Sequence, residues 1–152
     1  MDGAPPPVAG FVVSSFSPLV AAVAERCLRR AYGQPPADPA RGERTAIVLA
    51  SPLGDVAGAV HVARCVDTGA RVGPLLFFQS VPNAVAGHVA ARWGLSGPVV
   101  CLGAEDGLDM AELLVADGDA DEALVVHAYQ STGEGVPDRA TAVLVGRGAV
   151  TP

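Results

Sequence analysis

The sequence predicts an α/β protein with a mixed five-stranded sheet and helices on both faces of that sheet. Short apolar segments rich in valine and alanine alternate with longer segments whose apolar residues recur at helical spacing. The run at 45–50 is apolar throughout, which is typical of a central strand covered by helices on both faces. Two further strands, at 122–129 and 139–146, have no helix between them, which indicates an antiparallel pair.

Length and composition limit the classes of protein to consider. A chain of 152 residues that is 50% hydrophobic is expected to form a single domain over 1–152. A net charge of -6, with no lysine, argues against a nucleic-acid partner. No apolar run approaches the roughly 20 residues of a membrane span, and no basic region opens the chain as in a secretion signal. We therefore expect a cytoplasmic protein without a membrane partner.

The elements before residue 50 follow from local patterns. The segment 8–14 reads as a strand, and a helix should follow with Ser17 as its N-cap, Pro18 at its first position and Gly33 at its end. The proline-rich stretch 34–43 is expected to be a surface loop.

The elements after residue 50 alternate between helix and strand. Helical spacing predicts helices at 55–68, closed by Gly69, at 82–93, closed by Gly94, and at 108–116, followed by Gly118. A short strand is expected at 99–102. The apolar residues of 55–68 are expected to face a core, and small residues such as Gly87 would let another backbone approach the helix at 82–93.

Two motifs carry a family resemblance. The segment from Ser80 reads S-V-P-N, then A-G-H at 86–88 and G-L-S-G-P at 94–98, and G-D-A-D at 118–121 leads into the last pair of strands. This pattern resembles β-ketoacyl synthases over 45–145, roughly two thirds of the chain. The resemblance implies the N-terminal half of a thiolase-like fold, a three-layer α/β/α arrangement.

The chain departs from that family at its catalytic position. Ketosynthases place a nucleophilic cysteine shortly after the Gly-Pro pair, at a strand-to-helix turn, whereas residues 103–107 here read G-A-E-D-G. The interval from Pro98 to Gly118 is also shorter than in catalytic members. The chain ends at Pro152, before the second half that carries the two active-site histidines of ketosynthases. The resemblance therefore implies a truncated ketosynthase-like domain without independent condensing activity.

No residue is predicted with confidence as a catalytic group, and each candidate has a plainer interpretation. Cys101, the nearest thiol, lies in an apolar strand and is interpreted as a packed cysteine. Glu105 and Asp106 would suit general acid–base chemistry, but capping the helix that begins near Gly107 is the plainer role for Asp106. His88 belongs to the motif, where its place is structural.

Metal and cofactor binding are not expected. Three separated cysteines, with no pair at CxxC spacing, indicate buried reduced thiols. The histidines lack metal-ligand spacing, and the alternating aspartates at 117–121 lack the glycine and glutamate of a calcium loop.

Three hypotheses for function remain open. The first is a non-catalytic subunit that dimerises with a ketosynthase-fold protein in polyketide or fatty-acid biosynthesis, as chain-length factors do. The resemblance places that interface on strand 99–102 and the neighbouring helix, at Val99, Val100, Cys101, Leu102, Asn83 and Gly87. The second is a repurposed thiolase-fold enzyme, such as a dehydratase, isomerase or cyclase, acting on a carrier-bound acyl chain. The third is a homodimeric module that holds an acyl chain.

An acyl carrier protein is a further possible partner. Arg26, Arg29 and Arg30 form a basic patch that could meet such an acidic protein by charge. A solvated helix face is the plainer interpretation of this patch.

Overall fold

The computed structural model describes residues 4–11 and 13–152. Its centre is a sheet of five strands: β1 Thr45–Ala50, β2 Val99–Leu102, β3 Glu122–Tyr129, β4 Arg139–Gly146 and β5 Ala149–Thr151. The strand order is β2-β1-β3-β4-β5. β1 runs parallel to β2 and to β3, while β4 and β5 are antiparallel additions. The mixed five-stranded sheet is therefore confirmed.

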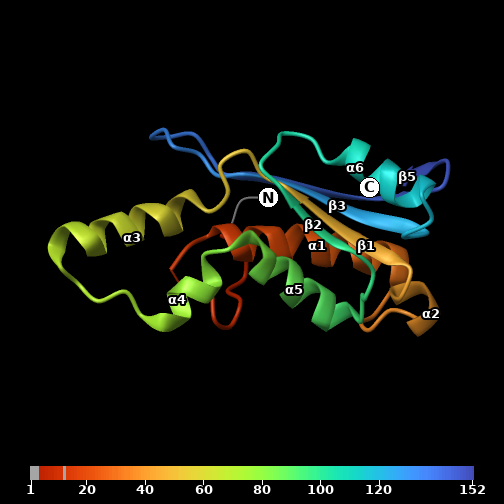
Figure 1. Ribbon diagram of the computed structural model, residues 1–152, viewed down its shortest axis with the longest axis horizontal. Coiled ribbons are helices and arrows are strands. Elements are labelled where there is room, and N and C mark those ends of the chain that lie inside the picture. Colours follow the sequence, from red (N-terminus) through yellow and green to blue (C-terminus); the bar gives the residue numbers. More distant parts are fainter. Residues whose placement is uncertain (1–3, 12) are drawn as a thin grey trace.

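Helices cover both faces of this sheet (Figure 1). Helices α1 Phe16–Tyr32 and α5 Pro82–Trp93 lie on one face, and α6 Leu108–Ala116 lies on the other. Ile47 and Leu49 point into the core under α1 and α5, whereas Ala46 and Val48 pack under α6. Because successive side chains of a strand alternate between faces, every residue of β1 is buried, as its unbroken apolar sequence predicts.

The strand predicted at 8–14 is wrong for the residues that the structure describes. Val8 and Phe11 form one isolated bridge, and Val12 lies outside the described residues. Phe11 donates its backbone N–H to the carbonyl of Val8 around Gly10, whose φ of +88° is readily accessible to glycine. The chain turns back on itself here, so the fifth strand of the sheet is β5 instead.

The ends of α1 differ in how well the sequence predicts them. The helix begins at Phe16, so Ser15 and not Ser17 occupies the N-cap position, and Ser17 is buried inside the first turn. Gly33 follows the last turn with a φ of 83°, as expected. The stretch 34–43 contains a short helix, α2 Pro39–Gly42, whose first backbone N–H groups donate to the Asp38 carboxylate.

Residues 53–81 form an arm that extends to one side of the sheet (Figure 1). It contains α3 Val56–Thr68 and α4 Pro74–Gln79, and the sequence pattern did not predict α4. The bounds of α3 agree with the predicted helix, and the Asp55 carboxylate accepts the Gly58 N–H at 2.8 Å. The expectation that its apolar residues face a core is wrong, because Val60 and Val66 are 43% and 71% exposed.

Within the described residues, no helix combines the length and the apolar character that crossing a bilayer requires.

Candidate functional site

The outer edge of β2 is the first candidate site. β2 pairs with β1 from Ile47↔Val99 to Ala50↔Leu102, and no other strand in the described part of the chain pairs with it. Its second row of backbone N–H and C=O groups is therefore available to a partner strand. Val99 is 43% exposed, and the other three residues of β2 are only partly buried.

An open hollow of about 720 Å³, which we call the edge groove, runs along this strand. All four residues of β2 line it, together with Leu53 and Val81 at the two ends of the arm and Asn83 in the first turn of α5. Leu53, Val81 and Val99 are large exposed apolar side chains, so the groove is apolar along its rim. The structure thus brings five of the six predicted interface residues to one surface.

Gly87, the sixth predicted interface residue, does not line the edge groove but lies one helical turn beyond Asn83 on α5. It is exposed, and a Cβ added to it would meet no atom within 4 Å. This face of α5 is open enough for another backbone to approach.

The turn at 103–107 joins β2 to α6. Gly107 is buried there, and an added Cβ would lie 2.9 Å from Cγ1 of Val48, so glycine is required for close packing. Oδ1 of Asp106 accepts the Leu108 N–H at 2.9 Å, and this bond, followed by the contact with His127, lowers the pKa of Asp106. Gly107 is the N-cap of α6 and no side chain of the described residues caps the helix, so the predicted capping role of Asp106 is wrong; Asp106 lies one residue earlier and accepts the N–H of Leu108, the first helical residue.

His127, on β3, contacts this turn, and the sequence pattern did not single it out as a site residue. Its Nε2 lies 3.0 Å from Oδ1 of Asp106 and 3.1 Å from the Gly107 N–H. These contacts require opposite states of the ring, because donating to Asp106 needs a proton on Nε2 and accepting from Gly107 needs a lone pair there. His127 faces Ala50 in the last register position of β1 and β3. In α/β sheets, functional groups often lie at the carboxyl ends of the parallel strands. His127 is near the carboxyl end of its strand, so this rule could have identified it from the sequence.

A second hollow, of about 510 Å³, opens beside His127. Glu105, Tyr129 and Arg139 also line it. Glu105 and His127 therefore share one hollow, and Asp106 touches His127. These three groups could support acid–base chemistry.

The three cysteines differ in burial. Only Cys27 is fully buried, whereas Cys65 and Cys101 are partly buried, so the expectation of buried thiols is correct for one of the three. Burial raises the pKa of Cys101, which keeps its thiol protonated and disfavours the reactive thiolate. Cys101 also packs against the core cluster under α1 and α5, as expected of a packed cysteine.

The four candidate catalytic residues do not lie together at one site: they are His88, Cys101, Glu105 and Asp106. His88 stands on α5 with its ring edge-to-face against Phe11, at 6.1 Å between ring centres, so it makes the packing contact that its motif implies. Cys101 lines the edge groove, while Glu105 lines the hollow beside His127. No group of three or more Cys, His, Asp or Glu side chains able to hold a metal occurs among the described residues.

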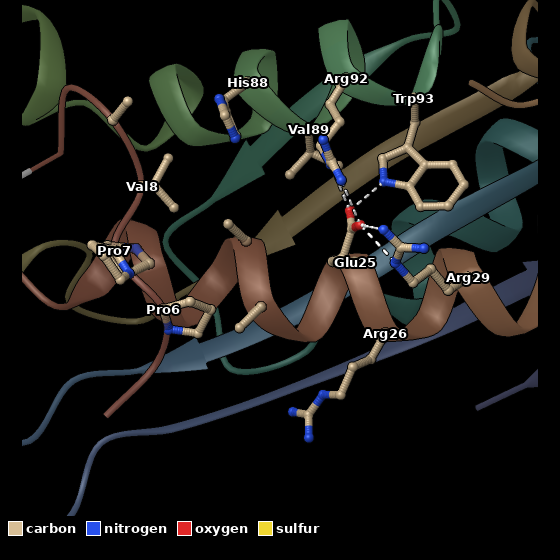
Figure 2. Close-up of a pocket in the computed structure, with 14 residues that line it drawn as sticks. Pro6, Pro7, Val8, Glu25, Arg26, Arg29, His88, Val89, Arg92 and Trp93 are labelled. Carbon is tan, nitrogen blue, oxygen red and sulfur yellow. Dashed lines mark hydrogen bonds and ion pairs between the residues drawn. The ribbon is translucent and has the colours of Figure 1, made fainter. Parts of the chain in front are cut away.

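A third hollow lies between α1 and α5, and Figure 2 shows the charged network at its wall. Glu25 of α1 accepts hydrogen bonds from Nε of Arg92 at 2.9 Å, from Nε of Arg29 at 2.8 Å, and from the indole Nε1 of Trp93 at 2.8 Å. The bond from Arg92 is the largest cause that lowers the pKa of Glu25 to about 2, and partial burial opposes it. This network joins α1 to α5.

The network changes the interpretation of the basic patch on α1. Arg29 is engaged by Glu25 and also donates to Gln34. Arg26 and Arg30 are exposed, and Figure 2 shows Arg26 pointing away from Glu25. Arg29 therefore takes part in the internal structure of this chain.

Comparison with known proteins identifies the fold. No protein-family model matches the sequence, and no curated protein matches it either. A chain from the structure of ketosynthase ApeO in complex with its chain length factor ApeC, from Xenorhabdus doucetiae, superposes with a TM-score of 0.70. The two sequences are 22% identical, and the match covers 92% of this chain and 60% of that one.

A β-ketoacyl synthase from Burkholderia phymatum STM815 superposes with a TM-score of 0.63 at 20% identity. That match covers 78% of this chain and 30% of the synthase. The protein thus corresponds to 60% or less of the length of these neighbours. This chain therefore shares the fold of these ketosynthase structures, with a mixed five-stranded sheet covered by helices on both faces.

Proposed function

We propose that this chain is a non-catalytic ketosynthase-like subunit that pairs with a ketosynthase-fold partner in polyketide or fatty-acid biosynthesis. The observation that carries the proposal is the free edge of β2, a short apolar strand beside an apolar groove. An exposed strand edge of this kind favours pairing with a strand of another chain. Asn83 and Gly87 on α5 would lie beside that strand in the interface.

The loss of the nucleophile supports a non-catalytic role. The turn at 103–107 contains no cysteine, and the nearest thiol, Cys101, lies within β2 and not at the start of α6. Ketosynthase chemistry needs a thiolate, and the raised pKa of Cys101 works against forming one. One structural neighbour comes from a complex between a ketosynthase and its chain length factor, which provides a precedent for two such chains working as a pair.

The proposal extends to the cellular setting. The pair would act in the cytoplasm on acyl groups delivered by an acyl carrier protein. Arg26 and Arg30 are exposed on α1 and offer positive charge to such an acidic protein.

Co-expression tests the pairing. The chain is produced with the ketosynthase encoded nearest to it, and the mass of the purified material is measured by light scattering on a sizing column. We expect one species with the summed mass of the two chains, and a ketosynthase from an unrelated pathway serves as the control. Separate elution of both proteins, or a species of twice 15.3 kDa beside a free synthase, would refute the proposal.

The contact between Asp106 and His127 favours a second candidate function. A carboxylate 3.0 Å from an imidazole, with Glu105 beside the same hollow, suits proton transfer during dehydration, isomerisation or cyclisation of a carrier-bound acyl chain. The purified chain is incubated with 3-hydroxyacyl and enoyl carrier proteins, and the products are followed by mass spectrometry. Turnover that disappears in a His127→Gln variant would support this candidate, and unchanged substrates would exclude these reactions.

A further inference from the structure

We propose that the hollow between α1 and α5 binds a free medium-chain carboxylate, which is an aliphatic chain that ends in a carboxylate group. The hollow has a volume of about 570 Å³, within the range of roughly 300–1,000 Å³ that is usual for small-molecule pockets. The residues that line it are all different from those that line the edge groove. The site is therefore independent of the pairing proposed above.

One end of the hollow is apolar. Pro6, Pro7 and Val8, which precede α1, line this end, and Figure 2 shows the three close to one another there. Ala21 and Ala22 of α1 add two small, partly buried side chains to the lining. An aliphatic chain placed here would remove apolar surface of both the chain and the protein from water, which is favourable.

The other end of the hollow is positively charged. Arg26, Arg29 and Arg92 line the hollow together with one carboxylate, that of Glu25. Figure 2 shows Glu25, Arg29 and Arg92 gathered at the end away from Pro6. The pKa of Glu25 is lowered to about 2, so this carboxylate is charged at neutral pH. Three guanidinium groups and one carboxylate give a local charge of +2 (3 − 1) in a chain of net charge -6, which favours an anionic ligand.

Glu25 does not close this end to an anion. Its carboxylate already accepts hydrogen bonds from Arg29, Arg92 and the indole of Trp93. The side chain of Glu25 is 25% exposed, against 40% for Arg29 and 46% for Arg92. A guanidinium group carries more N–H donors than one shared carboxylate can accept from. The two arginines can therefore bind a second carboxylate from the solvent side.

The length of the hollow suits a chain of medium length. From Pro18 to Arg29, which both line the hollow, α1 rises about 16 Å at roughly 1.5 Å per residue. Acetate would reach only the charged end, whereas an unbranched chain with a terminal carboxylate would occupy both ends. A thioester on a carrier protein has no negative charge at its carbonyl group, so the arginines favour the free acid over the carrier-bound form.

Trp93 provides a direct measurement of ligand binding. It is the only tryptophan of the chain, it lines the hollow, and its indole bonds to Glu25. Octanoate is titrated into the full chain, and tryptophan fluorescence and calorimetry measure the affinity. We expect saturable binding of one octanoate per chain. Octanol lacks the charge and acetate lacks the chain, so each should bind at least about tenfold more weakly.

A pair of double variants tests the charged end. Arg26→Gln with Arg29→Gln lowers the local charge from +2 to zero (2 − 2 = 0) and keeps Arg92 and Trp93 as donors to Glu25. The matched control, Arg64→Gln with Arg71→Gln, removes two exposed arginines that lie outside the hollow. We expect the first variant to bind octanoate at least about tenfold more weakly, and the control to change the affinity less than about twofold.

A second pair of variants tests the apolar end. Ala22→Phe fills part of the hollow, so it should weaken octanoate binding at least about tenfold. Ala91→Phe adds the same side chain at an exposed position of α5 outside the hollow, and it should change the affinity less than about twofold. Every replaced side chain is at least partly exposed, so circular dichroism and thermal melting should match those of the unmodified protein.

Several results would overturn the carboxylate site. Absence of saturable octanoate binding would do so, as would equal affinity for octanoate and inorganic phosphate or full affinity in Ala22→Phe. If octanoate does not bind and Arg26→Gln with Arg29→Gln weakens binding of an acyl carrier protein, these arginines recognise that acidic protein and not a carboxylate. Octanoate binding by a chain that pairs with no ketosynthase would support this inference and refute the proposed function.

Discussion

Oδ1 of Asp106 lies 3.0 Å from Nε2 of His127, although 21 residues separate them in the sequence. The same oxygen accepts the backbone N–H of Leu108, so one carboxylate connects the start of α6 to the end of β3. These bonds lower the pKa of Asp106, which means that the folded protein favours its charged form. The contact between Asp106 and His127 could support acid–base chemistry. The two contacts of Asp106 could also serve only to hold the start of α6 against β3.

Replacing Glu105 and Asp106 together by alanine tests whether these carboxylates act in catalysis or only in the structure. If the chain acts as a non-catalytic subunit, product formation by the complex should stay within about twofold, because exposed side chains outside an interface contribute little. Asp106 has a lowered pKa, so its contribution to stability is present above its unfolded value of 3.8 and is lost as the pH falls. Product is measured by chromatography, and complex mass by light scattering. A large loss of product with the complex intact would favour the enzymatic alternative.

Glu25 is expected to stabilise the contact between α1 and α5. Glu25→Ala leaves the buried indole N–H of Trp93 without its acceptor and should cost about 1–3 kcal/mol of unfolding free energy. Glu25→Gln keeps an acceptor, so it should cost less. Urea unfolding at neutral pH measures both variants, and equal losses would argue against the role of the indole bond.

The same network predicts a pH dependence. The folded pKa of Glu25 is about 2 against an ordinary value of 4.5, so its charged form stabilises the protein above about pH 4.5. The stability difference between the unmodified protein and Glu25→Gln should therefore shrink as the pH falls from 4.5 toward 2. Urea unfolding at a series of pH values measures this difference, and a constant difference would contradict the assignment.

The motif glycine Gly97 is predicted to be required by packing. An added Cβ would lie 2.7 Å from the carbonyl carbon of Thr45, so Gly97→Ala must displace the start of β1. We expect a loss of about 2 kcal/mol or more in unfolding free energy. Gly87→Ala is the matched control, since it meets no atom within 4 Å and should gain about 0.5–1 kcal/mol in a helix. Urea denaturation measures both, and equal effects would exclude this explanation.

The cysteines should react with iodoacetamide in a defined order. Burial raises the pKa of both Cys27 and Cys101, and Cys27 is only 3% exposed. We expect Cys65, which is partly exposed on the arm, to be alkylated first and Cys27 last. Peptide mass spectrometry follows the three sites. Preferential labelling of Cys101 would identify it as an activated thiol and contradict the non-catalytic proposal.

Local patterns were enough to predict most elements of the fold. The apolar run of β1 predicted a strand buried on both faces, and Gly33 and Gly94 predicted the ends of α1 and α5. These features depend on neighbouring residues along the chain, which the sequence shows directly. The segment at 8–14 has the composition of a strand, but Val8 and Phe11 form only an isolated bridge around the turn at Gly10.

The candidate sites depended more on contacts between distant residues. The sequence indicated that residues 103–107 contain no cysteine and that the strand of the edge groove is apolar, because both are properties of short segments. The sequence did not predict the contact between His127 and Asp106, which forms when β3 packs beside the turn at 103–107. It also did not predict the bond between Trp93 and Glu25, which forms when α5 packs against α1.

The sequence by itself determined the alternation of helices and strands, the motifs that resemble those of ketosynthases and the absence of a cysteine from residues 103–107. Only the tertiary structure decided that, within the part of the chain that the structure describes, no second strand pairs with β2 and the apolar side of α3 is uncovered. The reason is physical: periodicity shows which residues favour burial, whereas the surface available to bury them depends on how the elements pack in space.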